Sequence, residues 1–179
     1  MPVIHIFGAA GSGTSTLGHA LHERFGYSQI DTDDFFWLPT DPPFTRKRPV
    51  EERVTLITGE IAKYRNVVIS GSLCGWGDVL IPRFDLVIRL SVPVEVRLSR
   101  IKEREFRRFG EHILPNGDMY HKHQKFLLWS SEYDTGNTSM RSKAMHDEWQ
   151  SKLTCRCLTL NGPMPIDKLI NQIGEHFTF

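Results

Sequence analysis

Short apolar runs alternate along the chain with longer segments in which apolar residues recur every three or four positions. Short apolar runs bounded by glycine or polar turns are typical of buried strands, and the longer periodicity is typical of helices. The predicted strands are residues 3–7, 27–30, 67–70, 85–90 and 155–160. The predicted helices are residues 15–25, 50–64, 93–108, 118–133, 139–153 and 166–177.

This alternation from end to end predicts an α/β fold with a parallel sheet and helices on both faces. In such sheets, ligands bind beyond the carboxyl ends of the strands. Four motifs follow predicted strands, namely GAAGSGTS, DTDDFFW, SGSLCGWG and NGP. We therefore expect them to meet at one edge of the sheet and to form the functional site there.

The first of these motifs has the length and glycine spacing of a phosphate-binding loop. Its three glycines allow a turn whose backbone amides surround anionic oxygens, and the following helix adds its positive end. Ser15 stands at the hydroxyl position that ligates magnesium in this type of loop. The predicted nucleotide contacts are Gly8, Ala9, Ala10, Gly11, Ser12, Gly13, Thr14, Ser15 and Thr16. The alternative is a glycine-rich turn that binds no ligand.

Thr14 occupies the position at which this loop normally carries lysine. A lysine there would bring a mobile positive charge to the β and γ phosphates, whereas threonine offers only a neutral hydrogen bond. Removing one preorganised electrostatic donor costs about 3 kcal/mol in a transition state. The loop therefore predicts nucleotide binding, and phosphoryl transfer only if positive charge comes from elsewhere in the chain.

An acidic segment, DTDDFFW, follows the second predicted strand. Asp31 and Asp33 point to the same side if this segment is extended, so that one carboxylate could hold the water shell of magnesium while the other accepts a proton from a substrate hydroxyl. The alternative is an acidic turn or helix start without chemistry. The loop up to residue 49 adds aromatic and basic side chains, which either bind an acceptor or belong to the core. The predicted substrate contacts are Asp31, Asp34, Phe36, Arg48 and Gly71.

The segment RLSRIKEREFRRFG carries six basic and two acidic residues. Its arginines are spaced by three or four residues and therefore can share one helix face. If this face is turned toward the nucleotide, Arg100, Arg104 and Arg108 would stabilise the transferring phosphoryl group and supply the charge that Thr14 lacks. The alternative is a solvated helix balanced by glutamates. The glycine- and proline-bearing break at residues 110–117 favours a movable flap.

Two further features carry less information. Asn161 follows the last predicted strand and is either a contact of the adenine base or part of a plain turn. His112, His121, His123 and His146 lack the spacing of a metal site, so we expect them on the surface.

The composition argues against several classes of partner. The 22 basic and 21 acidic residues leave a net charge of +1, which provides no overall field for nucleic acid or an anionic membrane. No apolar stretch approaches the roughly 20 residues that span a bilayer, and the N-terminus has no basic leader. Three cysteines without metal or disulfide spacing favour a reducing cytoplasm. We expect a single domain, residues 1–179, as a monomer or homodimer.

The motifs GAAGSGTS and DTDDFF and the segment FDLVIRLSVPVEVRLSRIKER resemble the small P-loop kinases, which include adenylate, shikimate, gluconate and nicotinamide riboside kinases. The chain is also similar to adenylate-kinase-like proteins often classed as AAA-family ATPases. The resemblance implies a three-layer P-loop NTPase fold with a five-stranded parallel sheet in the order 2-3-1-4-5. It implies a substrate-binding region near residues 34–64 and a helical lid near residues 104–120. The nicotinamide riboside kinase-like and shikimate kinase-like patterns both imply that Asp33 is the base nearest the acceptor. We therefore assign Asp31, together with Ser15, to the magnesium ion.

We therefore predict a kinase that uses magnesium and ATP, or another nucleoside triphosphate. Its phosphoryl acceptor would be a nucleoside, a nucleotide or another small hydroxylated metabolite. Two alternatives stay open. One is a nucleotide-binding protein that has lost catalysis, for which Thr14 is the main evidence. The other is a slow NTPase without an acceptor.

Overall fold

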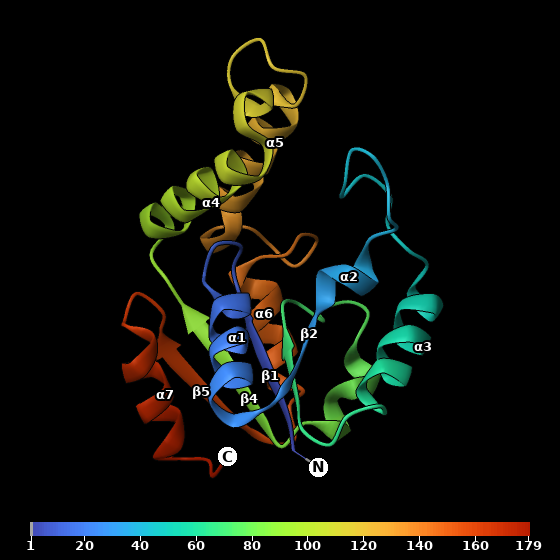
Figure 1. Ribbon diagram of the computed structural model, residues 1–179, viewed down its shortest axis with the longest axis vertical. Helices are drawn as coiled ribbons and strands as arrows, with labels where there is room; N and C mark the ends of the chain where they lie inside the picture. The colour runs from blue at the N-terminus through green and yellow to red at the C-terminus, as the bar shows by residue number, and fades with distance from the viewer. Residues whose placement is uncertain (1) are drawn as a thin grey trace.

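The computed structural model describes residues 2–179 and contains a five-stranded sheet (Figure 1). The strands are β1 (Val3–Gly8), β2 (Ser28–Asp31), β3 (Val67–Ser70), β4 (Leu86–Ser91) and β5 (Arg156–Asn161). Their order is β2-β3-β1-β4-β5, and every neighbouring pair is parallel. The predicted α/β fold and strand order are both confirmed. Because all strands run in one direction, the segments that follow them share one edge, which we call the carboxyl edge.

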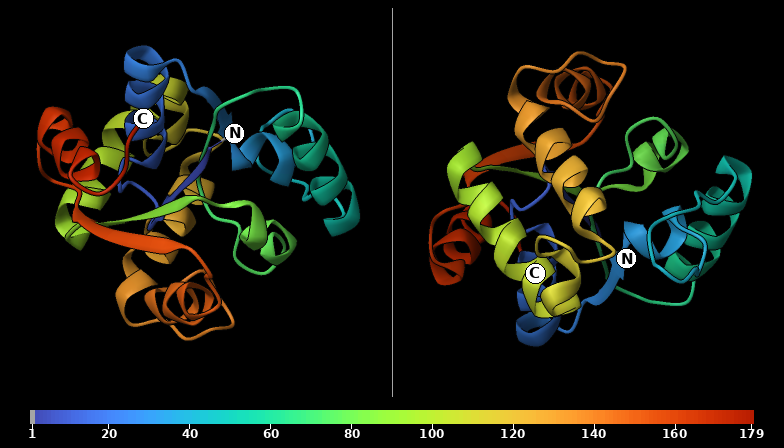
Figure 2. Two further views of the ribbon diagram at one scale, coloured as in Figure 1. Left: turned by 90° about the horizontal axis from the view of Figure 1, so that it is seen from below. Right: turned by 90° about the horizontal axis from the view of Figure 1, so that it is seen from above.

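Helices cover both faces of the sheet, as Figure 2 shows. One face packs against α1 (Thr14–Phe25) and α7 (Ile166–Gly174). The other packs against α3 (Val50–Ile61), α6 (Lys143–Ser151) and the short helix η1 (Asp78–Arg83). The molecule therefore has the three layers that a buried parallel sheet requires.

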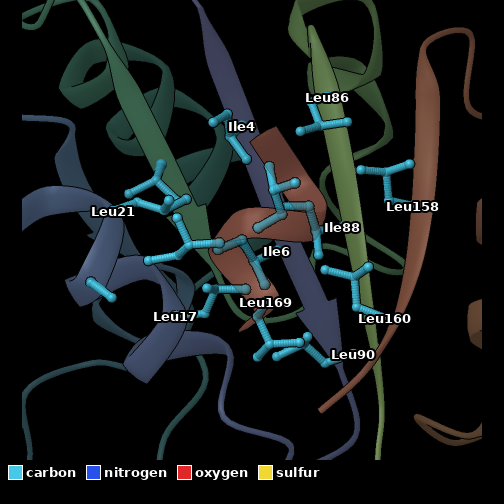
Figure 3. Close-up of a cluster of buried hydrophobic side chains, with 14 of the residues drawn as sticks. Ile4, Ile6, Leu17, Leu21, Leu86, Ile88, Leu90, Leu158, Leu160 and Leu169 are labelled. Carbon is cyan, nitrogen blue, oxygen red and sulfur yellow. The ribbon is translucent and has the colours of Figure 1, made fainter. Parts of the chain in front are cut away.

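The sheet has a cluster of buried apolar side chains on each face, and β1 contributes residues to both clusters. Ile4 and Ile6 pack toward Leu17 of α1 in a cluster of leucine and isoleucine side chains (Figure 3). Phe7 belongs to the opposite cluster and packs edge-on against Trp149 of α6, with 5.2 Å between the ring centroids. Burial on both sides explains why β1 is a continuous apolar run rather than an alternating one.

Two helices project beyond the carboxyl edge (Figure 1). They are α4 (Val94–Phe109) and α5 (Tyr120–Ser131), joined by η2 (Gly110–Ile113) and followed by η3 (Glu132–Asp134). We call these elements the α4–α5 arm. Within residues 2–179, neither these helices nor any other combines the length and apolar character needed to cross a membrane.

The base of the arm is fixed by Arg97, whose side chain is fully buried. Its guanidinium donates hydrogen bonds to the carbonyl oxygens of Val92 and Ser130 and forms an ion pair with Asp134. Arg97 therefore does not share the exposed face of the other α4 arginines, although its spacing predicts that it does. Asp134 is half-exposed, but the guanidinium of Arg97 is buried, so removing its partners would leave a buried charge unpaired.

Some predicted helix boundaries change. The helix expected at residues 139–153 begins only at Lys143, because the Ser142 hydroxyl caps it by accepting a 3.1 Å hydrogen bond from the Met145 amide. The helices predicted to end at residues 64, 133 and 177 all end slightly earlier. These ends fray into turns that apolar periodicity does not reveal.

The prediction that the histidines lie on the surface is wrong for His123 and His146, which are both buried. His146 Nδ1 lies 2.8 Å from the Tyr133 hydroxyl, and its Nε2 lies 3.4 Å from the Ser72 hydroxyl. Burial lowers the pKa of His146 to about 3, so the ring is neutral at physiological pH. His146 thus serves as a hydrogen-bonded core residue beside Trp149.

Gly71 provides a test of how closely the turn after β3 approaches Thr32, the first residue after β2. Its φ is 113°, and a Cβ atom there would lie 1.9 Å from the Thr32 hydroxyl oxygen. We expect Gly71→Ala to lower the free energy of unfolding by about 3 kcal/mol, because the side chain adds both strain and overlap. Urea denaturation measures this change.

The matched control is Gly59→Ala, in the last turn of α3, where no surrounding atom lies within 4 Å of the added Cβ. That substitution should raise stability by about 0.5–1 kcal/mol, because alanine favours the helix. Equal effects of the two substitutions would contradict the close packing of Gly71.

Candidate nucleotide and acceptor site

The loop between β1 and α1 has the backbone conformation that its glycines predict. Gly11 and Gly13 have φ angles of 79° and 96°, in the left-handed region that favours glycine. A Cβ atom on Gly11 would lie 2.5 Å from the Arg97 carbonyl oxygen, and one on Gly8 would lie 2.7 Å from the Leu90 carbonyl oxygen. The loop is therefore held closely between β4 and the base of the arm. Its turn, followed by the start of α1, suits an anionic group.

The remaining loop residues differ in their access to a ligand. Ala9 and Ser12 are buried beneath the loop, and Ala10 is half-buried. Thr14, at the first position of α1, is half-buried, whereas Thr16 is exposed. Thr14 therefore lies where the helix begins, and its side chain carries no charge that could replace lysine.

Ser15 and Asp31 connect this loop to the end of β2. The Ser15 hydroxyl donates a 2.7 Å hydrogen bond to one carboxylate oxygen of Asp31, and the other oxygen accepts a 3.0 Å hydrogen bond from the Asp33 amide. The two residues predicted to bind magnesium are therefore in direct contact. A hydroxyl and a carboxylate are hard oxygen ligands of the kind that Mg²⁺ accepts, together with waters and phosphate oxygens. The donor set fits this ion.

Asp33 lies on a short helix, α2 (Thr32–Phe36), rather than in an extended segment. The side chain of Asp31 caps this helix, so the expectation that Asp31 and Asp33 share one side of an extended strand is wrong. The segment instead has the conformation of an acidic helix start. The cap nevertheless brings the backbone of Asp33 next to the Asp31 carboxylate.

The pKa of Asp33 is raised above its ordinary value. Burial by the surrounding elements is the main cause, and the negative charges of Asp31 and Asp34 add to it, whereas Arg141 and Arg104 lower the pKa. Burial and Asp31 also raise the pKa of Asp34. Part of the Asp33 side chain is still exposed to water at the carboxyl edge. A reachable carboxylate with a raised pKa is a stronger base than an ordinary aspartate.

Arg100 lies at the inner end of the α4 arginine stripe. Its guanidinium approaches the carbonyl oxygens of Ser12 and Gly162, at 3.4 and 3.5 Å. Asn161, the last residue of β5, is exposed beside Gly162. Arg100 and Asn161 therefore flank the same side of the phosphate loop, away from Asp33.

Arg104 and Arg108 follow one and two turns further along α4. The positive charge of Arg104 acts on Asp33, and Arg108 lies 5.3 Å from the centroid of the Phe44 ring. The arm also meets this loop through Lys122 of α5, whose ammonium donates a 2.6 Å hydrogen bond to the Pro43 carbonyl. The predicted arginine stripe thus extends from the phosphate loop to the loop that follows α2.

Arg48 fixes the loop that follows α2. It donates hydrogen bonds to the carbonyl oxygens of Phe35 and Trp37, at 3.1 and 3.4 Å, and lies 3.8 Å from the Glu52 carboxylate. Phe36, predicted to contact the substrate, is half-buried and meets Trp37 edge-on. The Arg48 guanidinium is thus already engaged by its own loop, whereas the ring of Phe36 remains partly accessible.

Two arginines near this site are absent from the sequence prediction. Arg53 of α3 is 6% exposed and lies 3.9 Å from the Phe36 ring centroid. It shares the buried stripe of α3 with Ile57 and Ile61, and a charged residue in such a stripe is a signal that the sequence does carry. Arg141 precedes α6 and exerts the largest charge effect on Asp33. Nothing in the sequence places Arg141 beside a segment more than a hundred residues away.

Two curated proteins are similar to this chain in sequence. A Bacillus subtilis protein, the uncharacterized YqaC, is 38% identical over 175 residues, which cover 98% of this chain and 97% of YqaC. A cytidylate kinase from Pyrococcus horikoshii is 30% identical over 135 residues, covering 66% of this chain and 69% of that enzyme.

Solved structures show the same fold at lower identity. A shikimate kinase from Bacteroides thetaiotaomicron has a TM-score of 0.56 at 17% identity, and a deoxyadenosine kinase from M. mycoides with bound dATP has 0.56 at 16%. In both cases 97% of each chain is covered. The family profile described as "AAA domain" matches residues 4–111, more than half of the sequence. The chain therefore belongs to this AAA domain family and has the fold of the small P-loop kinases.

Proposed function

We propose that the protein is a magnesium-dependent kinase that transfers the γ-phosphoryl group of ATP to a hydroxyl group of a small molecule. The observation that carries this proposal is the hydrogen-bonded sequence from the Ser15 hydroxyl through the Asp31 carboxylate to the Asp33 amide. It joins a phosphate loop, a cation ligand and a base. The similarity to proteins named cytidylate kinases supports nucleotide-dependent phosphoryl transfer.

In this proposal the amides of residues 8–16 bind the triphosphate, and Arg100 and Asn161 border its nucleoside. Ser15 and Asp31 would hold Mg²⁺, which neutralises phosphate charge when bound. Residues 34–64 form the acceptor region, and residues 104–120 form a lid that excludes water.

The transfer itself needs a base and positive charge. The acceptor hydroxyl gives its proton to the Asp33 carboxylate while its oxygen forms the new bond to the γ-phosphorus. The bond from that phosphorus to the bridging oxygen of ADP breaks, and ADP leaves with the electron pair. Arg104 and Arg141, whose charges reach Asp33, stabilise the negative charge of the transferring group.

Thr14 supports a second candidate, a nucleotide-binding protein without turnover, because the loop lacks its lysine. The two functions separate in one assay. If the protein is an active kinase without the lysine, the wild type transfers phosphate to an acceptor. If it only binds nucleotide, the wild type shows no activity with any acceptor, and only the Thr14→Lys variant is active.

Binding of the nucleotide is tested by thermal denaturation. We expect magnesium and ATP at 100 times the dissociation constant to stabilise the fold by about 2.7 kcal/mol. Ser15→Ala should remove the part of this gain that requires magnesium, and Ser151→Ala, at the far end of α6, should leave it intact. No shift with any magnesium nucleotide would overturn the proposed function.

The base is tested with Asp33→Asn. We expect phosphoryl transfer to fall by about 10²–10⁴-fold, because the amide cannot accept the proton, while stabilisation by magnesium and ATP persists. Asp167→Asn, which removes an exposed carboxylate on α7, is the control for the change in charge. ATP hydrolysis that is unchanged in Asp33→Asn would favour an NTPase and remove the base assignment.

The raised pKa of Asp33 predicts a pH dependence. Transfer requires the unprotonated carboxylate, so kcat/KM should fall as the pH drops through a value above the ordinary aspartate pKa. Asp34→Asn removes a negative charge that raises the pKa and should shift the Asp33 titration to lower pH. Carbon NMR of the aspartate side chains measures this shift, and Asp167→Asn should not produce it.

A further inference from the structure

A cavity of about 250 Å³ lies at the carboxyl end of β4, where this strand meets β5, η3 and the start of α6. Its volume is well above the roughly 30 Å³ that one water molecule occupies in the liquid. Four of the lining residues are buried and mainly apolar, namely Ala9, Leu90, Val92 and Tyr133. The other lining residues carry charged or hydroxyl groups. An apolar lining with a few polar groups is typical of a site for a small molecule.

The cavity lies on the face of the sheet opposite α1. Side chains alternate between the two faces along a strand, and Val87, two residues before Arg89, belongs to the cluster that packs against α6. Arg89 and Ser91 therefore face the side of α6, and Thr159 of β5 is the register partner of Arg89. The phosphate loop leads into α1 on the other face (Figure 2). A ligand in the cavity would therefore lie behind the phosphate loop, of which Ala9 borders the cavity.

The charged groups around the cavity leave an excess of positive charge. Arg89 and Lys143 both donate to the carboxylate of Asp147, at 2.6 and 2.8 Å, so two cations share one anion. The carboxylate of Asp134 is paired with the guanidinium of Arg97. Among residues 2–179, these five groups pair with no other charged group, so three cations face two carboxylates. The side chain of Arg89 is only 12% exposed, and water therefore screens its charge poorly.

Hydrogen-bond donors are also in excess around this cavity. The ammonium group of Lys143 has three N–H donors, of which the contact with Asp147 uses one. The hydroxyl groups of Ser91 and Thr159 form no hydrogen bond with another protein group in the part of the chain that the structure describes. Lys143 is also the first residue of α6, and the N-terminal end of a helix adds partial positive charge. Ammonium, guanidinium and hydroxyl donors around an excess positive charge suit a small anion.

We propose that this cavity binds a small anion, a carboxylate or a phosphate, at a site separate from the nucleotide and acceptor sites. Lys143 and Arg89 supply the charge, and Ser91 and Thr159 complete the hydrogen bonds of the anion. The anion neutralises the positive charge that Asp147 leaves unbalanced.

The same cavity borders the groups that hold Arg97. The Val92 carbonyl accepts a 3.0 Å hydrogen bond from the Arg97 Nε, and Asp134 pairs with the guanidinium. The backbone of Arg97 in turn packs against Gly11 of the phosphate loop. An anion beside Val92 and Asp134 therefore acts on the phosphate loop and the base of the arm, which makes it an effector of nucleotide binding. This effector role rests on the proposed function, whereas the anion site does not.

The site is tested by titration calorimetry with malonate and with inorganic phosphate, at constant ionic strength. The protein is first saturated with magnesium and a non-hydrolysable ATP analogue, which fills the phosphate loop. We expect at least one of the two anions to bind, and the comparison between them separates a carboxylate site from a phosphate site. Malonamide, which has the shape of malonate without its charge, should not bind.

Two variants place the binding in the cavity. Lys143→Gln should weaken it about tenfold, the effect of losing a hydrogen bond to a charged group. Lys152→Gln is the matched control, because it removes the same charge at the other end of α6, where Lys152 pairs with Asp78. Ser91→Leu adds an apolar side chain to the lining without removing a charge and should abolish binding. Ser91 is exposed, so we expect this variant to fold with an unchanged melting temperature.

The effector role is tested by measuring the affinity of the analogue with and without a saturating anion. We expect a change of at least threefold, and the analogue must change the affinity of the anion by the same factor, since coupling between two sites is reciprocal. Lys143→Gln should reduce this change, and Lys152→Gln should not.

The outcomes separate the site from the function. Absence of binding with both anions, or equal affinity in the wild type, Lys143→Gln and Ser91→Leu, would overturn the anion site. Anion binding that leaves the affinity of the analogue unchanged would overturn only the effector role. If the analogue itself does not bind, the proposed kinase function is overturned. Titration of the two anions into nucleotide-free protein then tests the cavity with the same variants.

Discussion

The site depends on the carboxylate of Asp31, whose two oxygens hold the phosphate loop and α2 in register. One oxygen accepts from the Ser15 hydroxyl and the other from the Asp33 amide. Asp31 is the last residue of β2 and pairs with Ser70 of β3, so the register of the sheet determines where its side chain lies. A slip by one residue would turn that side chain to the opposite face and separate all three groups.

Arg97 has a comparable double role at the other end of the loop. Its backbone carbonyl occupies the space that a side chain on Gly11 would need, and its own side chain anchors the arm through Val92, Ser130 and Asp134. The phosphate loop and the arm are therefore positioned by the same residue. The direction in which Arg100 and Arg104 leave α4 follows from this anchor.

Local patterns were sufficient to predict the sheet and much of the loop. Strand order followed from resemblance, and the contact between Ser15 and Asp31 followed from motifs at the ends of adjacent strands. The conformation of Asp33 was predicted incorrectly, because a capped helix start and an extended acidic segment have similar sequences. His146 and Arg141 could not be placed, since their partners are distant in sequence and no periodicity reports them.

Because position 14 is threonine rather than lysine, phosphate binding and the supply of positive charge, which this type of loop usually combines, come from different parts of the chain. The loop amides and the start of α1 can bind phosphate without a side-chain charge. The cations that reach Asp33 come instead from Arg104 on the arm and from Arg141 before α6. In the proposed kinase, nucleotide affinity and the stabilisation of the transferring group would thus depend on different elements. The reacting phosphorus would then have its full set of positive charges only when the arm and the segment before α6 are both in place. Phosphoryl transfer would therefore depend on how these two elements are arranged around the acceptor.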